Sequence, residues 1–347
     1  MNVLIALAAT VVLAAIAYLV STAGAQIVFG IIVPYVALVL FLGGVLWRIF
    51  TWARVPVPFK IPTTCGQQVS LPWIKSATIE SPHTWWGVVA RMALEVFFFR
   101  SLFRNTRTEL HRAMGKGDVS KLAYASNEWL WLFALIFHYS FLLIFLRHFR
   151  LFTHPVPEWI NGIAYLDGFL QIGVPVLYLT DMGIVVAATF LFVRRLWHPH
   201  LRFISLVQDY FPLFLILGVA ITGILLRYWV RVDVVYVKEL ALGLLSFNPP
   251  TDADVLGSIN AMFFTHLFLV SVLIAYLPFS KLSHMAGVFF SPTRNMTNDN
   301  RMRRHVNPWS PKVKFHTYDE WENEFRKKMK AAGLPVDRDE PAQSEKE

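Results

Sequence analysis

The stretch that decides the fold is EWLWLFALIFHYSFLLIFLRHF, residues 128–149. A helix needs about 20 mostly apolar residues to cross the hydrocarbon core of a bilayer. This stretch is long enough, and it carries His138 and His148 at membrane depth. Five other stretches have the same apolar character, and they are 2–21, 27–50, 172–193, 206–229 and 262–284. The sequence therefore predicts an all-α integral membrane protein, a bundle of six transmembrane helices.

The composition supports a membrane protein. Hydrophobic residues make up 55% of the chain and charged residues 16%, against about 45–50% and about 25% in ordinary soluble domains. The single cysteine, Cys65, excludes an internal disulfide and a cluster held by four cysteines. Ala23-Gly24-Ala25 resembles a signal-peptide cleavage site, but no Lys or Arg follows Met1. We therefore expect the first span to be retained.

The charges between the spans predict the orientation. Segment 52–127 holds ten Lys and Arg against four acids, and segment 286–347 holds twelve Lys and Arg. Segments 151–171 and 231–261 hold only Arg231 and Lys238 against six acids. Because positively charged loops stay in the cytoplasm, we expect both termini there. The net charge of +9 is then explained by these cytoplasmic loops rather than by a nucleic-acid partner.

Four regions follow from this topology. They are two N-terminal helices (1–51), a cytoplasmic insert (52–127), a four-helix core (128–285) and a basic cytoplasmic tail (286–347) whose end we expect to be disordered. The insert begins with a proline-rich stretch at 55–62 that predicts extended chain. From Trp85 to Arg107 it has apolar residues at helical spacing, with arginines among them. This pattern predicts a basic amphipathic helix at the inner membrane surface or against a partner, or a plain surface helix.

Two pairs of histidines lie inside the predicted spans: His138 and His148 in the third, His266 and His284 in the sixth. Ionisable residues at this depth are rare and mark functional sites. The two spans run in opposite directions, so His138 faces His284 toward the cytoplasm and His148 faces His266 toward the outside. The spacings of 10 and 18 residues correspond to about 15 Å and about 27 Å of helix, a mismatch that tilt and a kink near Pro278 must absorb.

This arrangement is typical of two bis-histidine haems, each bridging the two helices. Zinc and di-iron sites need histidines three or four residues apart, and none of the four has such a neighbour. With both axial positions filled, the chemistry is electron transfer. An electron-transfer path through two haems across a membrane needs a quinone at one end and a soluble redox partner at the other. That partner must be another subunit.

The two spacings, with the motif Pro278-Phe279-Ser280-Lys281-Leu282-Ser283-His284, resemble the cytochrome b (gamma) subunit of respiratory nitrate reductase. Further motifs resemble the DsrM family, the membrane cytochrome b of the DsrMKJOP complex of dissimilatory sulfate and sulfur metabolism. They are residues 61–68, 91–96, 291–295 and 305–309, and the resemblance covers nearly the whole chain. The first helix and the insert depart from the nitrate reductase pattern.

The resemblance implies a place and partners for the chain. These are the prokaryotic cytoplasmic (inner) membrane, menaquinone as substrate, and two haem b groups, the inner one on His138 and His284 and the outer one on His148 and His266. A cytoplasmic iron–sulfur subunit resembling heterodisulfide reductase (DsrK-like) is implied as partner, with DsrJ, DsrO and DsrP as further subunits. The insert and the tail would bind the iron–sulfur subunit. The chain would be an enzyme only as part of that menaquinol/menaquinone oxidoreductase.

Quinone chemistry moves protons, so an acid or base is needed near the outer haem. The candidates are Arg147 beside His148, Asp167 at the outer start of the fourth span and Asp181 deeper in it. Arg150 and Lys281 are candidates for the haem propionates, or for interfacial anchors.

Two other classes of function stay open at this point. A proton or ion channel gated by histidines would explain ionisable groups in the bilayer, but not two matched pairs. A haem-free membrane anchor for a redox complex would use the same helices and basic loops, and only bound haem distinguishes it.

Overall fold

The computed structural model describes residues 1–55, 66–111, 119, 121–170, 175–291, 293–303 and 315–337. The chain forms two units, Met1–Met302 and Arg303–Glu347, which are considered separately. The motif residues 61–65, Pro292 and 305–309, Cys65, most of the proline-rich stretch and the end of the tail lie outside the described residues.

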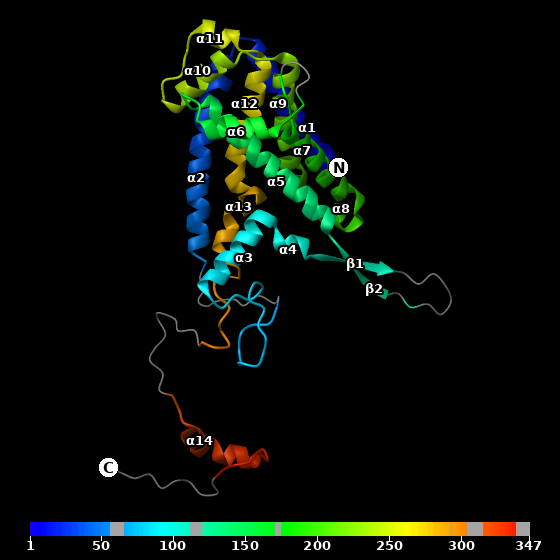
Figure 1. The fold of residues 1–347 in the computed structure, drawn as a ribbon, viewed down its shortest axis with the longest axis vertical. Coiled ribbons are helices and arrows are strands. Elements are labelled where there is room, and N and C mark those ends of the chain that lie inside the picture. The colour runs from blue at the N-terminus through cyan, green and yellow to red at the C-terminus, as the bar shows by residue number, and fades with distance from the viewer. Residues whose placement is uncertain are drawn as a thin grey trace. The chain divides into compact units, whose positions relative to one another are not determined.

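The first unit is a bundle of long apolar helices (Figure 1). Among the residues that the structure describes, five segments are long and apolar enough to cross a membrane. They are α1 (Asn2–Thr22), Val28–Ala53 with α2 (Val33–Ala53), Glu128–Leu151 with α5 (Glu128–His148), Val207–Val230 with α9 (Val207–Leu225) and Ala261–Phe279 with α12 (Ala261–Tyr276). The prediction of an all-α membrane protein is confirmed. The span predicted at 172–193 corresponds to α7, which begins at Leu179 and ends at Trp197. α7 carries Asp181, Arg194 and Arg195, and it is not among these five segments. A sixth crossing stays a prediction.

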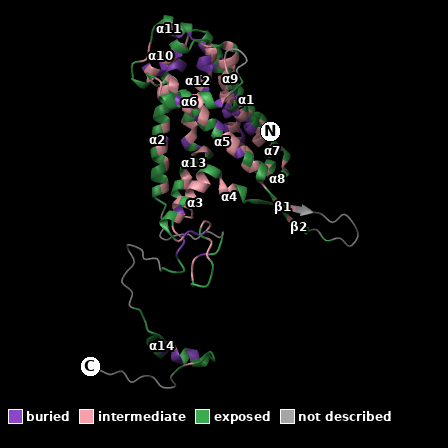
Figure 2. Ribbon diagram, in the orientation of Figure 1, coloured by how far each residue is buried: buried purple, intermediate pink, exposed green. Residues whose placement is uncertain are grey.

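The long helices pack in a definite order. α5 packs against α7, α7 against α9, and α9 against α1, while α12 packs against α1, α2 and α9. Much of the outer surface of this bundle is exposed, most evidently along α2 (Figure 2), and many of the exposed residues are large and apolar. Apolar surface costs about 25 cal/mol per Å² in water, so this surface suits lipid rather than solvent.

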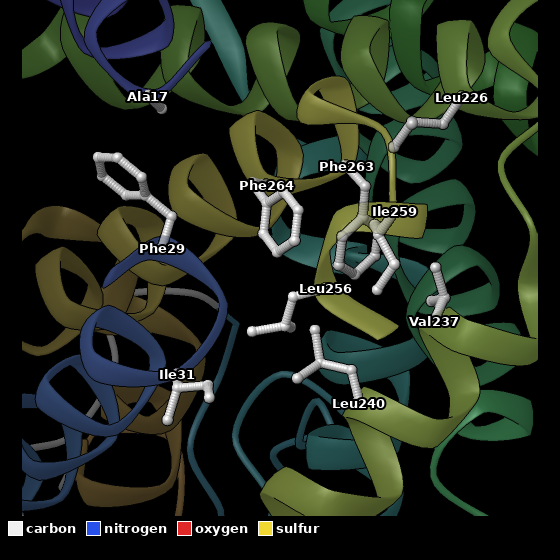
Figure 3. Close-up of a cluster of buried hydrophobic side chains, with 10 residues drawn as sticks. All are labelled: Ala17, Phe29, Ile31, Leu226, Val237, Leu240, Leu256, Ile259, Phe263 and Phe264. Carbon is white, nitrogen blue, oxygen red and sulfur yellow. The ribbon is translucent and has the colours of Figure 1, made fainter. Parts of the chain in front are cut away.

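The largest core cluster lies at one end of the bundle. It joins α1, the turn before α2, α10 (Val234–Leu245), α11 (Ala253–Ser258) and α12, and Figure 3 shows its ten side chains. Phe264 is fully buried at its centre, and a Cβ on Gly30 would lie 2.9 Å from its ring. Glycine at position 30 therefore lets the start of the second span approach α12.

Short elements connect the long helices. They are α3 (Trp85–Phe98), α4 (Arg100–Phe103), α6 (Glu158–Asp167), α8 (Pro199–Ile204), α13 (His284–Gly287), and the antiparallel pairs β1 (Thr106–His111) with β2 (Lys121–Ser126) and β3 (Gly168–Leu170) with β4 (Leu177–Tyr178). In the first pair, Thr106 lies opposite Ser126 and His111 opposite Lys121.

The single helix predicted from Trp85 to Arg107 is wrong. α3 ends at Phe98, and Phe99 adopts left-handed dihedrals (φ 50°, ψ 44°) before α4 begins. Side chains of α5 hold this break, because the Trp131 indole and the Tyr139 hydroxyl donate hydrogen bonds to the carbonyls of Phe98 and Phe97. Tertiary contacts thus override a helical pattern that is local.

The second unit contains α14 (Tyr318–Ala331). The Thr317 hydroxyl accepts a hydrogen bond from the backbone of Glu320, and the Glu320 carboxylate accepts one from the backbone of Thr317. The two bonds form a capping box. Glu322 is almost fully buried, and it accepts hydrogen bonds from Arg326 and from the backbone of Asp337. The basic tail therefore holds a defined helix.

The end of α12 depends on a close contact with α2. The helix predicted to continue to 284 ends at Tyr276, and a 3₁₀ turn at Leu277–Phe279 follows because Pro278 lacks a donor. Arg48 of α2 donates hydrogen bonds to the carbonyls of Pro278 (3.0 Å) and Ser280 (3.4 Å). A Cβ on Gly44 would lie 2.8 Å from the Pro278 side chain, whereas one on Gly43 would meet nothing within 4 Å.

Gly44→Val is expected to lower the free energy of unfolding by about 1–3 kcal/mol, because the new side chain overfills this contact. Gly43→Val is the matched control, since it changes the same helix one residue away in open space. Thermal unfolding of the purified chain in detergent measures both. Equal midpoints for the two variants would contradict the contact.

Candidate functional site

The inner histidine pair joins α5 to the chain beyond α12. The ring centroids of His138 and His284 are 6.1 Å apart. His284 does not lie on the long helix but at the start of α13, after the break at Pro278 and Ser280. The helical rise of about 27 Å expected between His266 and His284 holds only if one continuous helix joins them. Because the helix breaks between them, the mismatch with the rise of about 15 Å between His138 and His148 no longer applies. Phe99 packs edge-on against His138 at 5.0 Å, so the broken insert helix borders this pair.

The outer histidine pair joins α5 to α12 directly. The ring centroids of His148 and His266 are 6.4 Å apart and their planes differ by 19°. The C-terminal half of α9 lies close to the second ring, since a Cβ on Gly223 would sit 3.2 Å from the Cε1 atom of His266. The structure thus places four histidines, distant in sequence, as two pairs with nearly the same separation.

Hydrogen bonds fix which nitrogen each ring can offer. The Nδ1 atoms of three rings lie 2.7–2.8 Å from backbone carbonyl oxygens, which only accept: His138 on Ala134, His148 on Ile144 and His284 on Lys281. Nδ1 of these rings therefore carries the proton, and Nε2 keeps its lone pair.

In the fourth ring, that of His266, Nδ1 is also engaged in a hydrogen bond, but with a side chain instead of a backbone carbonyl. Nδ1 of His266 lies 2.9 Å from the Thr222 hydroxyl, which itself donates to the carbonyl of Gly218 (2.8 Å). A hydroxyl has one proton, so it accepts from His266. A metal-binding histidine usually engages its second nitrogen in this way, which orients the ring.

The separations fit an ion held between two rings. An imidazole nitrogen lies about 2.0 Å from a metal it binds, so rings on opposite sides of one ion have centroids about 6 Å apart once the ring radii are added. The measured separations are 6.1 and 6.4 Å. The two pairs therefore have the spacing and the free nitrogens that two bis-histidine haems require.

A buried charged network lies beside the outer pair. Arg147, which precedes His148, forms an ion pair with Asp167, whose Oδ2 lies 3.1 Å from Nη1. Through Nη2 it donates hydrogen bonds to Asp181 Oδ1 (2.9 Å) and Thr180 Oγ1 (3.1 Å). Arg147 and Asp167 are only 8% and 5% exposed. The structure thus brings together the three residues predicted for proton chemistry. Asp167 lies at the end of α6 rather than in the next long helix, and it accepts hydrogen bonds from the backbone and hydroxyl of Thr180.

Two tyrosines complete this network, and the sequence alone does not indicate their part in it. The Tyr228 hydroxyl donates to Asp181 Oδ2 (2.9 Å). The Tyr178 ring lies between two guanidinium groups, 3.7 Å from that of Arg147 and 4.0 Å from that of Arg227. Tyr228 stands out in the sequence only as an aromatic residue at a span end, so nothing local could show that it reaches Asp181.

The two predicted propionate candidates lie at opposite ends of the histidine pairs. Arg150 lies in the short turn after α5, near His148. Lys281 lies near His284, but its ammonium group binds Asp209 Oδ1 at 2.6 Å. Arg195 lies 3.7 Å from the same oxygen. Lys281 therefore already has an acidic partner on α9.

Comparison with known proteins identifies the family. Residues 82–305 match the family model of the nitrate reductase gamma subunit. The chain belongs to this family. The match covers the insert from α3 onward, both histidine pairs and the charged network, and it confirms the predicted resemblance at the level of the family.

Two curated relatives cover most of the chain. A protein of Archaeoglobus fulgidus named "Hdr-like menaquinol oxidoreductase cytochrome b-like subunit" is 46% identical over 288 residues, 82% of this chain and 84% of the relative. A protein of the same name from Archaeoglobus profundus is 44% identical over 282 residues, 80% of this chain and 81% of the relative. This member of the gamma family is thus similar to two cytochrome b-like subunits over about four fifths of its length.

Proposed function

We propose that this chain is a membrane cytochrome b subunit with two haems that exchanges electrons between menaquinone and a cytoplasmic iron–sulfur subunit. The observation that carries the proposal is the pairing of four histidines at 6.1 and 6.4 Å, each with Nδ1 engaged and Nε2 free. The names of the relatives supply the quinol and the class of complex.

The residues divide into an inner and an outer site. His138 and His284 would hold the inner haem b, and His148 and His266 the outer one. A haem with two histidine ligands supplies one-electron transfer and offers no open position to a substrate. The protein fixes ring direction through four hydrogen bonds and separates the two sites along α5 by ten residues, or about 15 Å of helix.

The charged network is the proposed place for the quinone's protons. Asp181 is 13% exposed and lies beside the outer pair, with one oxygen on Arg147 and the other on the Tyr228 hydroxyl. A carboxylate so placed can accept a proton while Arg147 holds it in position. Asp167 pairs with Nη1 of Arg147, and the Thr180 hydroxyl accepts a hydrogen bond from Nη2.

The finer assignment rests on the sequence resemblance. We place the chain in a DsrMKJOP-like complex of dissimilatory sulfate or sulfur metabolism, in the prokaryotic cytoplasmic membrane with both termini inside. Its partners would be a DsrK-like iron–sulfur subunit resembling heterodisulfide reductase, with DsrJ, DsrO and DsrP. The "Hdr-like" name of both relatives supports such a partner. The basic insert and tail would bind it on the cytoplasmic side.

A dithionite-reduced minus oxidised spectrum of the purified chain, with a pyridine haemochrome assay, tests this proposal. We expect about two b haems per polypeptide, one for each histidine pair. The haem should be bound non-covalently, because the chain's single cysteine excludes a Cys-x-x-Cys-His attachment site. No haem in protein purified from a haem-replete host would contradict the proposal and favour the anchor or the channel.

A further inference from the structure

A second site lies away from both histidine pairs, where α5 begins and α7 ends. A hollow of about 430 Å³ opens there between the first turn of α5, the foot of the β1–β2 pair and the last turns of α7. Its polar lining includes Arg107, Arg194 and His198, and its apolar lining includes Trp129, Phe190 and Trp197. None of these residues is among those proposed for the haems or for the quinone's protons.

The hollow carries positive charge that the described residues only partly balance. Arg107 pairs with Glu109 at 2.7 Å, and Arg195, the neighbour of Arg194, turns to Ser205 and Asp209. Arg194 itself has no carboxylate partner among the residues that the structure describes. Partial burial and the guanidinium groups of Arg194 and Arg107 lower the pKa of the His198 imidazole, which keeps this ring as a neutral hydrogen-bonding group. An anion placed here would offset the repulsion between the two arginines.

The walls of the hollow suit the boundary between lipid and water. Trp129 and Trp197 are 69% and 80% exposed at the ends of their helices, where indole rings favour the headgroup layer. Deeper along the same helices, Phe133 of α5 stacks on Phe190 of α7 with centroids 3.9 Å apart. Phe190 also lines the hollow, so this pair of apolar rings borders it between the two helices.

We propose that this basic hollow binds the phosphate of an acidic phospholipid on the side that the positive loops assign to the cytoplasm. The arginines and His198 recognise the phosphodiester, and the indoles and Phe190 accept the glycerol and the start of the acyl chains. Basic pockets between transmembrane helices on this side of a membrane bind such headgroups. A soluble phosphate would use the arginines but gain nothing from the aromatic walls.

Native mass spectrometry of the delipidated full chain in detergent tests the site, with dioleoyl phosphatidylglycerol as the titrated probe. We expect saturation of one tight site in the wild type and a loss of affinity of at least about tenfold in Arg194→Gln and Arg107→Gln, because each removes a charge-assisted contact. Arg54→Gln is the matched control, since it removes one cation from the same membrane side at the exposed end of α2. It should bind as the wild type does.

Two further arms separate the sources of phosphate. Dioleoyl phosphatidylcholine should bind more weakly at this site, and millimolar inorganic phosphate should fail to displace phosphatidylglycerol from the wild type. Arg194→Lys should retain part of the affinity, which distinguishes lost charge from lost folding. Equal binding by wild type and Arg194→Gln would overturn the site, and full displacement by inorganic phosphate would overturn its assignment to lipid. The result does not depend on haem content.

Discussion

Replacing His148 with alanine is expected to lower the haem content from about two per chain to about one. The outer pair would lose the Nε2 of one ring, and His266 alone cannot supply two axial ligands. The inner pair keeps both of its rings, because His138 and His284 are held by Ala134 and by Lys281 rather than by the outer site. His266→Ala should remove the same haem, and His138→Ala and His284→Ala should each remove the other.

The four variants form one test of the pairing. Pyridine haemochrome counts the haems, and redox titration of the difference spectrum shows which of two midpoint potentials is lost. His200→Ala is the control, because this exposed histidine lies on α8 outside both pairs. If His138→Ala and His284→Ala removed haems of different potential, the proposed pairing would be wrong.

The sequence predicted which histidines would meet, but not how. Spacing and topology were enough to place His138 opposite His284, since antiparallel helices bring their like ends together. They could not show that α12 stops at Tyr276. That end depends on Pro278, which is visible in the sequence, and on Arg48 and Gly44, which lie more than 200 residues away on α2. A local pattern does not record a contact at that distance.

The insert shows that a helical pattern in the sequence does not reveal where the helix ends. Its apolar spacing predicts a helix through Phe99, and α3 does form over Trp85–Phe98. The helix breaks because Trp131 and Tyr139 take the carbonyls that its next turn would have used. Helical periodicity reports which face is apolar, whereas a partner element decides where the helix ends.

The charged network was predicted as three separate residues and forms one unit. Arg147 and Asp181 are 34 positions apart, and Tyr228 is 47 positions from Asp181. Each alone has an ordinary explanation as an anchor at the membrane surface. Their convergence gives each buried charge a partner, which offsets the cost of burying two carboxylates and an arginine. The proposed role in quinone chemistry rests on the position of this network beside His148.

Asp181→Asn is therefore expected to slow reduction of the chain by a menaquinol analogue by about 10²–10⁴-fold, the usual contribution of a positioned acid or base. The amide keeps the size of the side chain and can still accept from Tyr228, but it cannot take up a proton at neutral pH. Haem content should stay at about two, because His148 hydrogen-bonds to Ile144 and not to Asp181. Stopped-flow absorbance at the haem bands measures the rate, with dithionite reduction as the reference for full reducibility.

The matched control is Asp233→Asn, which makes the same chemical change on the same predicted side of the membrane. Asp233 caps α10 by accepting from the backbone of Val235, and asparagine caps a helix about as well. Its rate should equal that of the wild type. A normal rate in Asp181→Asn would remove this carboxylate from the proton path. Asp167, which pairs with the other terminal nitrogen of Arg147, would then be the remaining acid of the network. Slow reduction by dithionite as well would instead mean that the substitution had disturbed the outer histidine pair.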